Sequence, residues 1–286
     1  MLVLRADEMG MCFGVRDALA ALDRVADPEA VTIHGEVVHN PEVLALLDRR
    51  GFRRSDEAAR TVPQTPVVAI TAHGISERER ARLLAAGKQL IDTTCPLVVR
   101  AHEAAQRFAA AGARVIVLGR PNHVEVCGIV EDLPDPLVVS GHGDVAAWPQ
   151  TLFGVVCQTT TRVETARELL AAIRAANPHA EVRFADTICA PTKARIDALE
   201  ALLPHVDALV VVGGHDSNNT RQLALRAEQR SVRALHVAHV RELVPGWFDG
   251  VTAVGLTAGT STLPRTIDEV HGWLVRLGAQ RRGRSA

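Results

Sequence analysis

Three cysteines fall at intervals of roughly one third of the chain, and two of them end the same short motif. Cys95 ends Asp-Thr-Thr-Cys, and Cys189 ends Asp-Thr-Ile-Cys 94 positions later. Cys12 lies in MGMCFGV, 83 positions before Cys95. Each cysteine lies within two residues of a glycine or proline, where the chain turns and a thiolate can project from the edge of a folded unit. This pattern favours three ligands of one metal centre at the meeting point of three units.

Thiolates bind zinc and iron–sulfur clusters alike, and the spacing leaves the choice between them open. The paired Cys-x-x-Cys of zinc ribbons and the clustered cysteines of ferredoxins are missing from the sequence. A simple structural zinc site and a pure electron carrier are therefore disfavoured. Three protein ligands on a four-iron cluster would leave one iron open to act as a Lewis acid, which indicates catalysis. Cys127 and Cys157 lie in apolar segments and are expected to be structural.

Polar residues follow most of the predicted strands. Small hydroxyls, amides, histidines and backbone N–H groups at helix entrances bind phosphate groups without lysine. A single Ser, Thr or Asn before a helix is also an ordinary N-cap, and a single histidine is often structural. Five such loops together predict a site for a small phosphorylated ligand. They lie at His39, His73, Thr159, 215–220 and 259–261.

Composition narrows the setting of this site. The 286 residues include 32 basic and 33 acidic side chains, so the net charge of -1 provides no global field to attract DNA, RNA or an anionic membrane. The sequence has no run of 18 apolar residues and no signal-peptide pattern at its start, which predicts a cytoplasmic protein. An odd number of cysteines in that compartment argues against a disulfide framework.

Short apolar, β-branched runs alternate with longer amphipathic stretches, which is typical of βα units with a parallel sheet. Nine strands and nine helices are too many for one small sheet, so we expect an α/β fold of three pseudo-equivalent units, each with a small, mostly parallel sheet. Breaks after the motif cysteines divide the chain into a first unit of 14–96, a second of 97–190, and a third of 1–13 with 191–286. The strands are expected at 31–38, 67–72, 89–94, 113–119, 137–140, 152–158, 208–214, 234–238 and 251–258. The helices are expected at 14–26, 41–50, 76–86, 96–111, 123–131, 162–176, 191–203, 218–228 and 264–277.

An ordered set of motifs across nearly the whole chain resembles one enzyme family. The set is GMCFGV, EVVHNPEV, TAHG, DTTCPLV, HVEV, QTTT, DTICAPT, VVGGHDSNNT and GLTAGTST. It resembles 4-hydroxy-3-methylbut-2-enyl diphosphate reductase, which reduces and dehydroxylates an allylic diphosphate to isopentenyl and dimethylallyl diphosphates. That reaction is the last step of the methylerythritol phosphate route to isoprenoids. The resemblance implies three α/β units around a central 4Fe-4S cluster.

The resemblance also implies a role for individual residues. The cluster would be held by Cys12, Cys95 and Cys189, with the substrate hydroxyl on the fourth, open iron. Glu125 would deliver a proton, and the Thr159 hydroxyl would lie beside the reacting end of the substrate. The residues implied to bind substrate are His39, His73, His123, Thr159, Ser217, Asn218, Asn219 and Ser261. The implied partners are a small allylic diphosphate and an electron donor such as ferredoxin or flavodoxin with its NADPH-dependent reductase, without nucleic acid or membrane.

The chain departs from the family pattern at several positions close to these residues. Asn218 replaces a serine, Cys127 a glutamate, Val124 a proline and His215 a lysine, while Thr192 is kept. One alternative is therefore a divergent paralogue that acts as an iron–sulfur redox sensor or binds a related allylic diphosphate. Another is a cluster-dependent dehydratase, which shares the open iron but transfers no net electrons. The retained Glu125 argues against a sensor, because sensing needs no proton donor.

Overall fold

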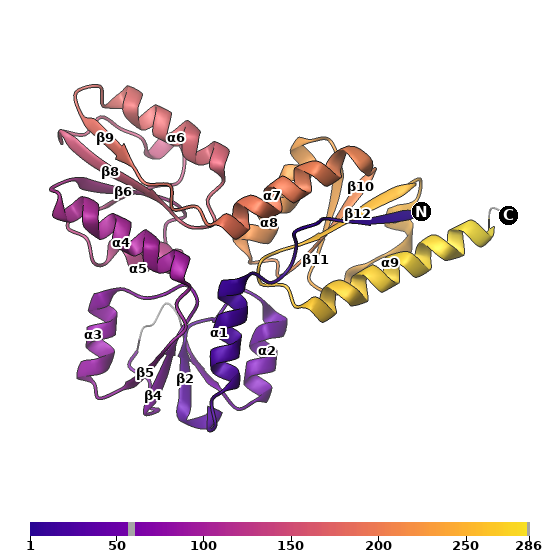
Figure 1. Cartoon of the computed structure of the whole chain (residues 1–286), viewed down its shortest axis with the longest axis horizontal. Helices are drawn as coiled ribbons and strands as arrows, with labels where there is room; N and C mark the ends of the chain where they lie inside the picture. The colour runs from indigo at the N-terminus through magenta and orange to yellow at the C-terminus, as the bar shows by residue number, and fades with distance from the viewer. Residues whose placement is uncertain (57–60, 285–286) are drawn as a thin grey trace. The chain divides into compact units, whose positions relative to one another are not determined.

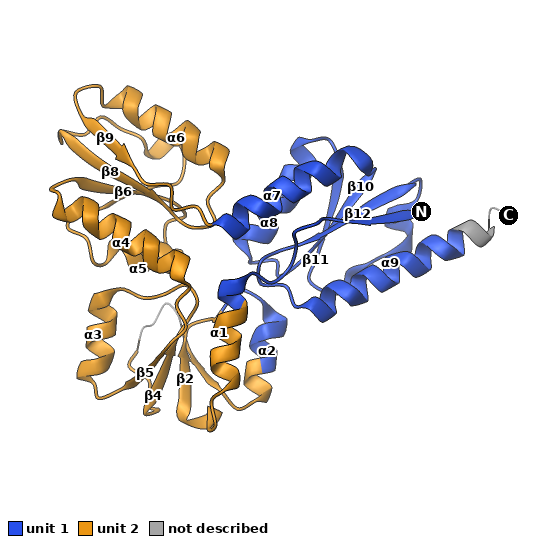
Figure 2. Ribbon diagram, in the orientation of Figure 1, with its two compact units in different colours: residues 1–15, 38–46, 190–286 blue, residues 16–37, 47–189 orange. Residues whose placement is uncertain are grey.

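A computed structural model describes residues 1–56 and 61–284 (Figure 1). It contains three four-stranded sheets in which the paired strands are parallel, so the predicted fold class is confirmed. The chain divides into two compact units (Figure 2). Unit 1 comprises 1–15, 38–46 and 190–286, and unit 2 comprises 16–37 and 47–189. The expected division into three units with breaks after 96 and 190 stays a prediction.

The first sheet belongs to unit 2 and has the strand order β3-β2-β4-β5. Its apolar residues Val68 and Ile70 pack on Ile75 and on Leu83 of α3. The strands are β2 (Val31–His34), β3 (Arg53–Ser55), β4 (Val67–Ile70) and β5 (Gln89–Asp92). The helices of this part of the chain are α1 (Phe13–Asp23), η1 (Pro28–Ala30), α2 (Pro41–Arg49) and α3 (Glu77–Ala85).

The second sheet also belongs to unit 2 and has the order β7-β6-β8-β9. Successive residues of β6 point to opposite faces, so Ile116 packs against α6 while Val115 and Val117 pack against α4 and α5. The strands are β6 (Arg114–Leu118), β7 (Leu137–Val139), β8 (Leu152–Cys157) and β9 (Glu181–Phe184). The helices are α4 (Pro96–Ala110), α5 (Val124–Val130), η2 (His142–Asp144) and α6 (Val163–Ala176).

The third sheet belongs to unit 1 and has the order β1-β12-β10-β11. The same alternation places Val210 against α9 and Leu209 against α7 and α8. The strands are β1 (Leu2–Arg5), β10 (Ala208–Val212), β11 (Arg233–Val237) and β12 (Ala253–Ala258). The helices are α7 (Ala190–Leu202), η3 (Leu203–His205), α8 (Asn218–Gln229), η4 (Val240–Glu242), η5 (Pro245–Phe248) and α9 (Pro264–Arg284).

The three sheets repeat one topology. In the orders β3-β2-β4-β5, β7-β6-β8-β9 and β11-β10-β12-β1, the last strand is an edge strand that leads to one of the three spaced cysteines. A long helix begins directly after each of these cysteines: α4, α7 and α1 respectively. The three cysteines therefore occupy corresponding places in three pseudo-equivalent sheets.

Each of the nine predicted strands and nine predicted helices is present in the described residues, and most of their ends differ by a few residues. The last helix, expected at 264–277, continues to Arg284. The expected strand 31–38 is too long, because Gly35 has a φ of +98° and ends β2 at His34. Three strands escaped the prediction, namely β1, β3 and β9, and each is an edge strand. β3 and β9 read Arg-Arg-Ser and Glu-Val-Arg-Phe, so these two lack the apolar run by which the others are recognised. No helix in the described residues is long and apolar enough to span a bilayer.

Candidate active site

The repeated Asp-Thr-x-Cys motif forms the same turn twice in unit 2. The Asp92 carboxylate accepts a hydrogen bond from the backbone N–H of Thr94 at 2.9 Å, and the Asp186 carboxylate accepts one from the N–H of Ile188 at 3.2 Å. An aspartate that bonds the backbone two residues later stabilises a tight turn. Each aspartate thus turns the chain just before its cysteine.

The threonine of each motif joins this turn to the neighbouring strand. The Thr93 hydroxyl donates to the carbonyl of Ile70, the last residue of β4. The Thr187 hydroxyl donates at 2.6 Å to the carbonyl of Cys157, the last residue of β8, and accepts from the N–H of Cys157 at 2.7 Å. Cys157 is buried here as a structural residue, as its apolar surroundings predicted.

The backbone N–H of each spaced cysteine has an equivalent partner. Each cysteine follows an edge strand, and its N–H donates to a carbonyl in the loop after the strand next to that edge strand, which is β4, β8 or β12. In each case the carbonyl lies two residues beyond the last residue of that strand. The bonds are Cys95 to Ala72 at 3.0 Å, Cys189 to Thr159 at 2.9 Å, and Cys12 to Thr260 at 3.0 Å.

The positions of these three cysteines suit the thiolate ligands of a metal cluster. Cys12, Cys95 and Cys189 are partly exposed thiols, and each directly precedes a helix of 11 to 15 residues. The N-terminus of a helix carries a partial positive charge that favours an anionic group. Cys127 differs because it lies within α5. An anionic iron–sulfur cluster therefore fits the donor set that these three residues offer.

Glu125 is a buried carboxyl group at the second position of α5. Its side chain is only 2% exposed, and it accepts hydrogen bonds from the Thr159 backbone N–H at 2.6 Å and from the Thr159 hydroxyl at 3.0 Å. Burial raises the pKa of Glu125 to about 7, although the two bonds from Thr159 act in the opposite direction. Glu125 can therefore hold a proton near neutral pH and release it to a bound molecule.

Two of the predicted histidines lie next to each other in unit 2. His123 is the N-cap of α5, and its Nδ1 accepts from the N–H of Glu125 at 3.2 Å. The rings of His73 and His123 meet edge to face, with 5.6 Å between their centroids. Unit 2 therefore groups His73, His123, Glu125 and Thr159, and both motif cysteines follow edge strands of its sheets.

In unit 1, the start of α8 carries the predicted amides. Ser217 is the N-cap of α8, and its hydroxyl accepts from the N–H of Thr220 at 3.4 Å. Asn218 and Asn219 follow as the first two residues of this helix. The Asn219 Oδ1 accepts from the N–H of Thr260 at 3.0 Å, whereas its Nδ2 is buried and has no hydrogen-bond partner among the described residues. A buried amide donor without a partner suits an anionic ligand.

The other predicted residues of unit 1 lie beside this helix start. Asn40 caps α2 through a 2.9 Å bond from the N–H of Glu42, and its Nδ2 donates to the carbonyl of Ser261 at 2.7 Å. A Cβ atom on Gly214 would lie 2.8 Å from the His39 carbonyl, so only glycine allows this close approach. Unit 1 therefore brings His39, Ser261 and the start of α8 together beyond the carboxyl ends of its central strands, β10 and β12.

Sequence reasoning missed a buried arginine, Arg195, close to Cys12. Its side chain is 4% exposed, and its Nε donates to the Gly10 carbonyl at 3.1 Å while its Nη1 donates to the Pro191 carbonyl at 2.9 Å. Arg195 thus ties the loop before Cys12 to the first turn of α7. No motif signals this role, because its partners are backbone carbonyls that any residue provides.

The predicted site residues accordingly fall into two sets. Unit 1 holds Cys12, His39, Ser217, Asn218, Asn219 and Ser261, and unit 2 holds the others. Within the part of the chain that the structure describes, no three His, Cys, Asp or Glu side chains form a site for a single metal ion.

Comparison with known proteins identifies the family. The family model described as LytB protein matches residues 3–275. The chain belongs to the LytB family. Its LytB relatives include the 4-hydroxy-3-methylbut-2-enyl diphosphate reductase of Anaeromyxobacter sp. (strain Fw109-5), which is 36% identical over 94% of this chain and 95% of that protein. The enzyme of the same name from Geotalea uraniireducens (strain Rf4) is 34% identical over 94% of this chain and 95% of that protein.

Solved structures of LytB-type reductases have the same fold. The Plasmodium falciparum E-1-hydroxy-2-methyl-but-2-enyl-4-diphosphate reductase aligns with a TM-score of 0.88 at 27% identity, covering 96% of this chain and 87% of that one. A second, an (E)-4-hydroxy-3-methyl-but-2-enyl diphosphate reductase described as the terminal enzyme of the non-mevalonate pathway, aligns with a TM-score of 0.69 at 30% identity. This alignment covers 96% of this chain and the full length of the solved structure. The resemblance to this enzyme family is therefore confirmed, and LytB enzymes use a 4Fe-4S cluster.

The raised pKa of Glu125 predicts a pH-dependent stability. Between about pH 4.5 and 7, the folded chain binds the Glu125 proton more tightly than the unfolded chain does, so stability falls as pH rises through this window. Since one pKa unit corresponds to about 1.4 kcal/mol, the parent chain should lose about 3 kcal/mol relative to Glu125→Gln. Urea denaturation of the metal-free chains from pH 4.5 to 8 measures the difference. Parallel pH profiles would show that Glu125 titrates near its ordinary pKa.

Proposed function

We propose that this chain reduces and dehydroxylates (E)-4-hydroxy-3-methylbut-2-enyl diphosphate to isopentenyl and dimethylallyl diphosphates, the last step of the non-mevalonate isoprenoid route. The observation that carries the proposal is the hydrogen bond from the Thr159 N–H to the buried Glu125 carboxyl group. The carbonyl of the same threonine accepts a bond from the Cys189 N–H. The reaction consumes two electrons and two protons. One C–O bond breaks, the hydroxyl leaves as water, and a C–H bond forms on the allyl group.

The proposed ligands of the 4Fe-4S cluster are Cys12, Cys95 and Cys189. Their equivalent backbone bonds and their places before helices support this assignment. When bound, the cluster would supply the two electrons one at a time and provide one iron that the chain does not ligate. The physiological donor of these electrons would be a ferredoxin or flavodoxin with its NADPH-dependent reductase.

The proposed general acid is Glu125. Its pKa of about 7 lets it carry a proton at neutral pH, and hydroxide is a poor leaving group unless it is protonated. The Thr159 hydroxyl, 3.0 Å from the Glu125 carboxyl group, orients this proton toward the reacting end of the substrate. Their near-complete burial keeps competing water away from the proton.

The proposed diphosphate ligands supply imidazole, amide and hydroxyl donors in place of lysines. His39, Ser217, Asn218, Asn219 and Ser261 belong to unit 1, while His73 and His123 belong to unit 2. The start of α8 adds backbone N–H groups and the positive end of the helix dipole. These contacts would hold the charged end of the substrate and leave its allyl end for Glu125 and Thr159.

Anaerobic turnover of the cluster-loaded chain tests the proposal. With dithionite and a mediator dye as reductant, the chain should convert the diphosphate to the two isomeric products, identified by mass spectrometry and chromatography. A chain that binds the diphosphate without reducing it would be a redox sensor. A product formed by loss or gain of water without reductant would identify a dehydratase.

Serine substitutions should separate the cluster ligands from the structural cysteines. Cys12→Ser, Cys95→Ser and Cys189→Ser should each lose most of the cluster, because a hydroxyl is a poor ligand for its iron. Cys127→Ser and Cys157→Ser should retain it. Iron and sulfide counts with visible spectra of anaerobic samples measure the outcome. Full cluster content in any of the first three variants would refute its assignment as a ligand.

Glu125→Gln should retain the cluster and bind substrate but lose most turnover. General acids contribute about a hundredfold to ten-thousandfold, and the poor leaving group predicts the upper part of that range. Thr159→Val should reduce turnover less, because water can partly replace the hydroxyl. Single-turnover kinetics measure both effects, and near-normal reduction by the Gln variant would remove Glu125 as the acid.

Two substitutions at Asn219 test the diphosphate end. Asn219→Asp keeps the acceptor for the Thr260 N–H but replaces the buried amide donor with an anionic oxygen. Asn219→Ala removes both groups. Both variants should raise KM more than they lower kcat, because the contact exists in ground and transition states alike. Charge repulsion should make the aspartate variant the weaker binder, and tight binding by that variant would place the diphosphate elsewhere.

A further inference from the structure

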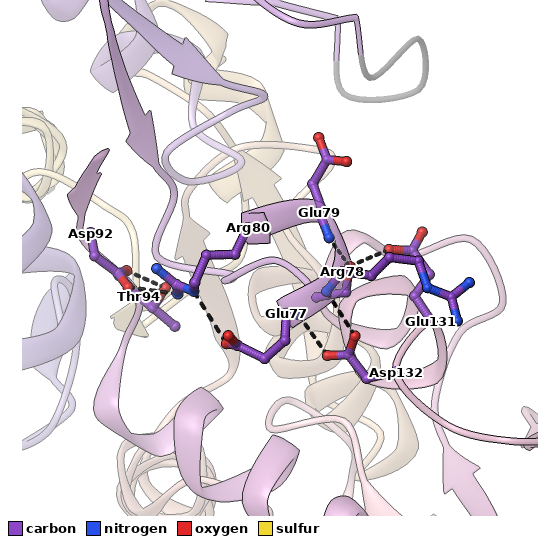
Figure 3. Close-up of polar contacts among 9 residues, drawn as sticks. Glu77, Arg78, Glu79, Arg80, Asp92, Thr94, Glu131 and Asp132 are labelled. Atoms are coloured by element: carbon purple, nitrogen blue, oxygen red, sulfur yellow. Dashed lines mark hydrogen bonds and ion pairs between the residues drawn. The ribbon is translucent and has the colours of Figure 1, made fainter. Parts of the chain in front are cut away.

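The C-terminal end of α5 is joined to the first turn of α3 within unit 2 (Figure 3). The Asp132 carboxylate accepts from the backbone N–H of Glu77 at 2.7 Å and from that of Arg78 at 3.1 Å. These are the first two residues of α3, whose N–H groups have no partner inside the helix. A carboxylate from the second sheet's part of the chain therefore caps a helix of the first sheet.

A buried serine adds a second bond between the same two helix ends. Ser76 is the N-cap of α3 and is fully buried. Its hydroxyl accepts from the N–H of Glu79 at 3.0 Å and donates to the Glu131 carboxylate at 2.7 Å. Glu131 and Asp132 directly follow α5. We name these contacts of Ser76, Glu77 and Arg78 with Glu131 and Asp132 the α5–α3 junction.

The opposite side of α3 is tied to the turn before Cys95. Arg80 pairs with Asp92 at 2.7 Å and with Glu77 at 3.2 Å. Burial opposes the charge on Asp92, but bonds from Thr94 and Arg80 outweigh it and lower the pKa of Asp92. Asp92 therefore stays ionised at neutral pH. Its carboxylate also holds the N–H of Thr94, the residue before Cys95, at 2.9 Å. A continuous series of contacts thus leads from the Cys95 turn to the end of α5 (Figure 3).

The helix α5 has only seven residues, and both its ends and its buried residues Val126 and Ile129, which pack in the core beside α4, determine where it lies. Its middle is closely packed, because a Cβ on Gly128 would come within 3.2 Å of the His102 ring and 3.5 Å of the Ile75 backbone. Glu125 occupies the second position of this helix and Asp132 lies just beyond its last residue. A seven-residue helix is about 10 Å long and moves as one body. A displacement at Asp132 is therefore transmitted to Glu125.

We propose that Asp132 and Glu131 are positioning residues for Glu125, holding α5 on α3 so that the acid keeps its place relative to the Cys95 turn. This inference rests on the proposed function, in which Glu125 donates the proton. The acidic side chains of the first turn of α3, Glu77 and Glu79, are paired with Arg80 and Arg82 of the same helix. Capping bonds to a carboxylate are charge-assisted, which strengthens the junction.

Asp132→Asn tests the junction with little change in shape. An amide has one acceptor oxygen, so it can retain only one of the two backbone bonds that the carboxylate accepts. Asp144→Asn is a control for the loss of charge alone, because Asp144 accepts the N–H groups of Ser140 and Gly141 through a single oxygen, which an amide retains. Ser76→Ala provides a second variant that removes the bond to Glu131.

Hydrogen exchange of the cluster-loaded, oxygen-free protein shows whether the junction holds α5. Asp132→Asn and Ser76→Ala should speed exchange in 124–130 about tenfold, whereas Asp144→Asn should leave exchange in 124–130 unchanged. Unchanged exchange in 124–130 in both junction variants would overturn the inference. This readout does not depend on turnover.

Kinetics then show whether the junction acts through Glu125. Asp132→Asn should lower kcat about tenfold, with a smaller effect on KM, because a misplacement near 1 Å is costly to a catalytic group. In a Glu125→Gln background the same substitution should change the residual turnover less than twofold, since no acid remains to be misplaced. An equal loss in both backgrounds, or the same loss in Asp144→Asn, would reduce the junction to a stability contact. Absence of reduction by the parent chain would refute the proposed function instead.

Discussion

The backbone of Thr159 holds two parts of the proposed site at once. Its N–H donates to the Glu125 carboxyl group at 2.6 Å, and its carbonyl accepts from the Cys189 N–H at 2.9 Å. Thr159 follows β8, Glu125 follows β6, and Cys189 follows β9. These three neighbouring strands must therefore keep their parallel register for both bonds to form. The side chains that line those strands serve to keep this residue in place.

Unit 1 uses the same backbone arrangement for different chemistry. The N–H of Thr260 donates to the Asn219 side chain and its carbonyl accepts from the Cys12 N–H, as Thr159 does with Glu125 and Cys189. Asn219 and Glu125 are both the second residue of the helix that follows a central strand. In the proposed function, the acid at this position provides a proton, whereas the amide provides a hydrogen-bond donor for an anion. The proposal thus assigns two different roles to one helical position of the same scaffold.

Local patterns were sufficient to predict the fold and the places of the cysteines. Buried strands such as β10 are continuous apolar runs, and Asp-Thr-x-Cys forms the same turn in both sheets because the bonds of its aspartate are short-range. Cys12 lacks the Asp-Thr pair, so only its spacing indicated its equivalence. The role of Arg195 and the α5–α3 junction were not predicted. Both depend on which backbone groups meet after folding, and neither a helix cap from another sheet nor a bond to a distant carbonyl leaves a periodic pattern.

The pairing of β1 with β12 has a consequence for the order in which the protein acquires its structure during synthesis. Leu2 lies opposite Ala253, so β1 leaves the ribosome long before β12, the strand with which it pairs, has been made. Both sheets of unit 2 are complete by Phe184 and can form earlier. Cys12 precedes Cys95 and Cys189 in the chain, yet its backbone partner, Thr260, is synthesised after the partners of the other two, Ala72 and Thr159. The backbone bond that fixes the turn at Cys12 can therefore form only after both sheets of unit 2 have left the ribosome.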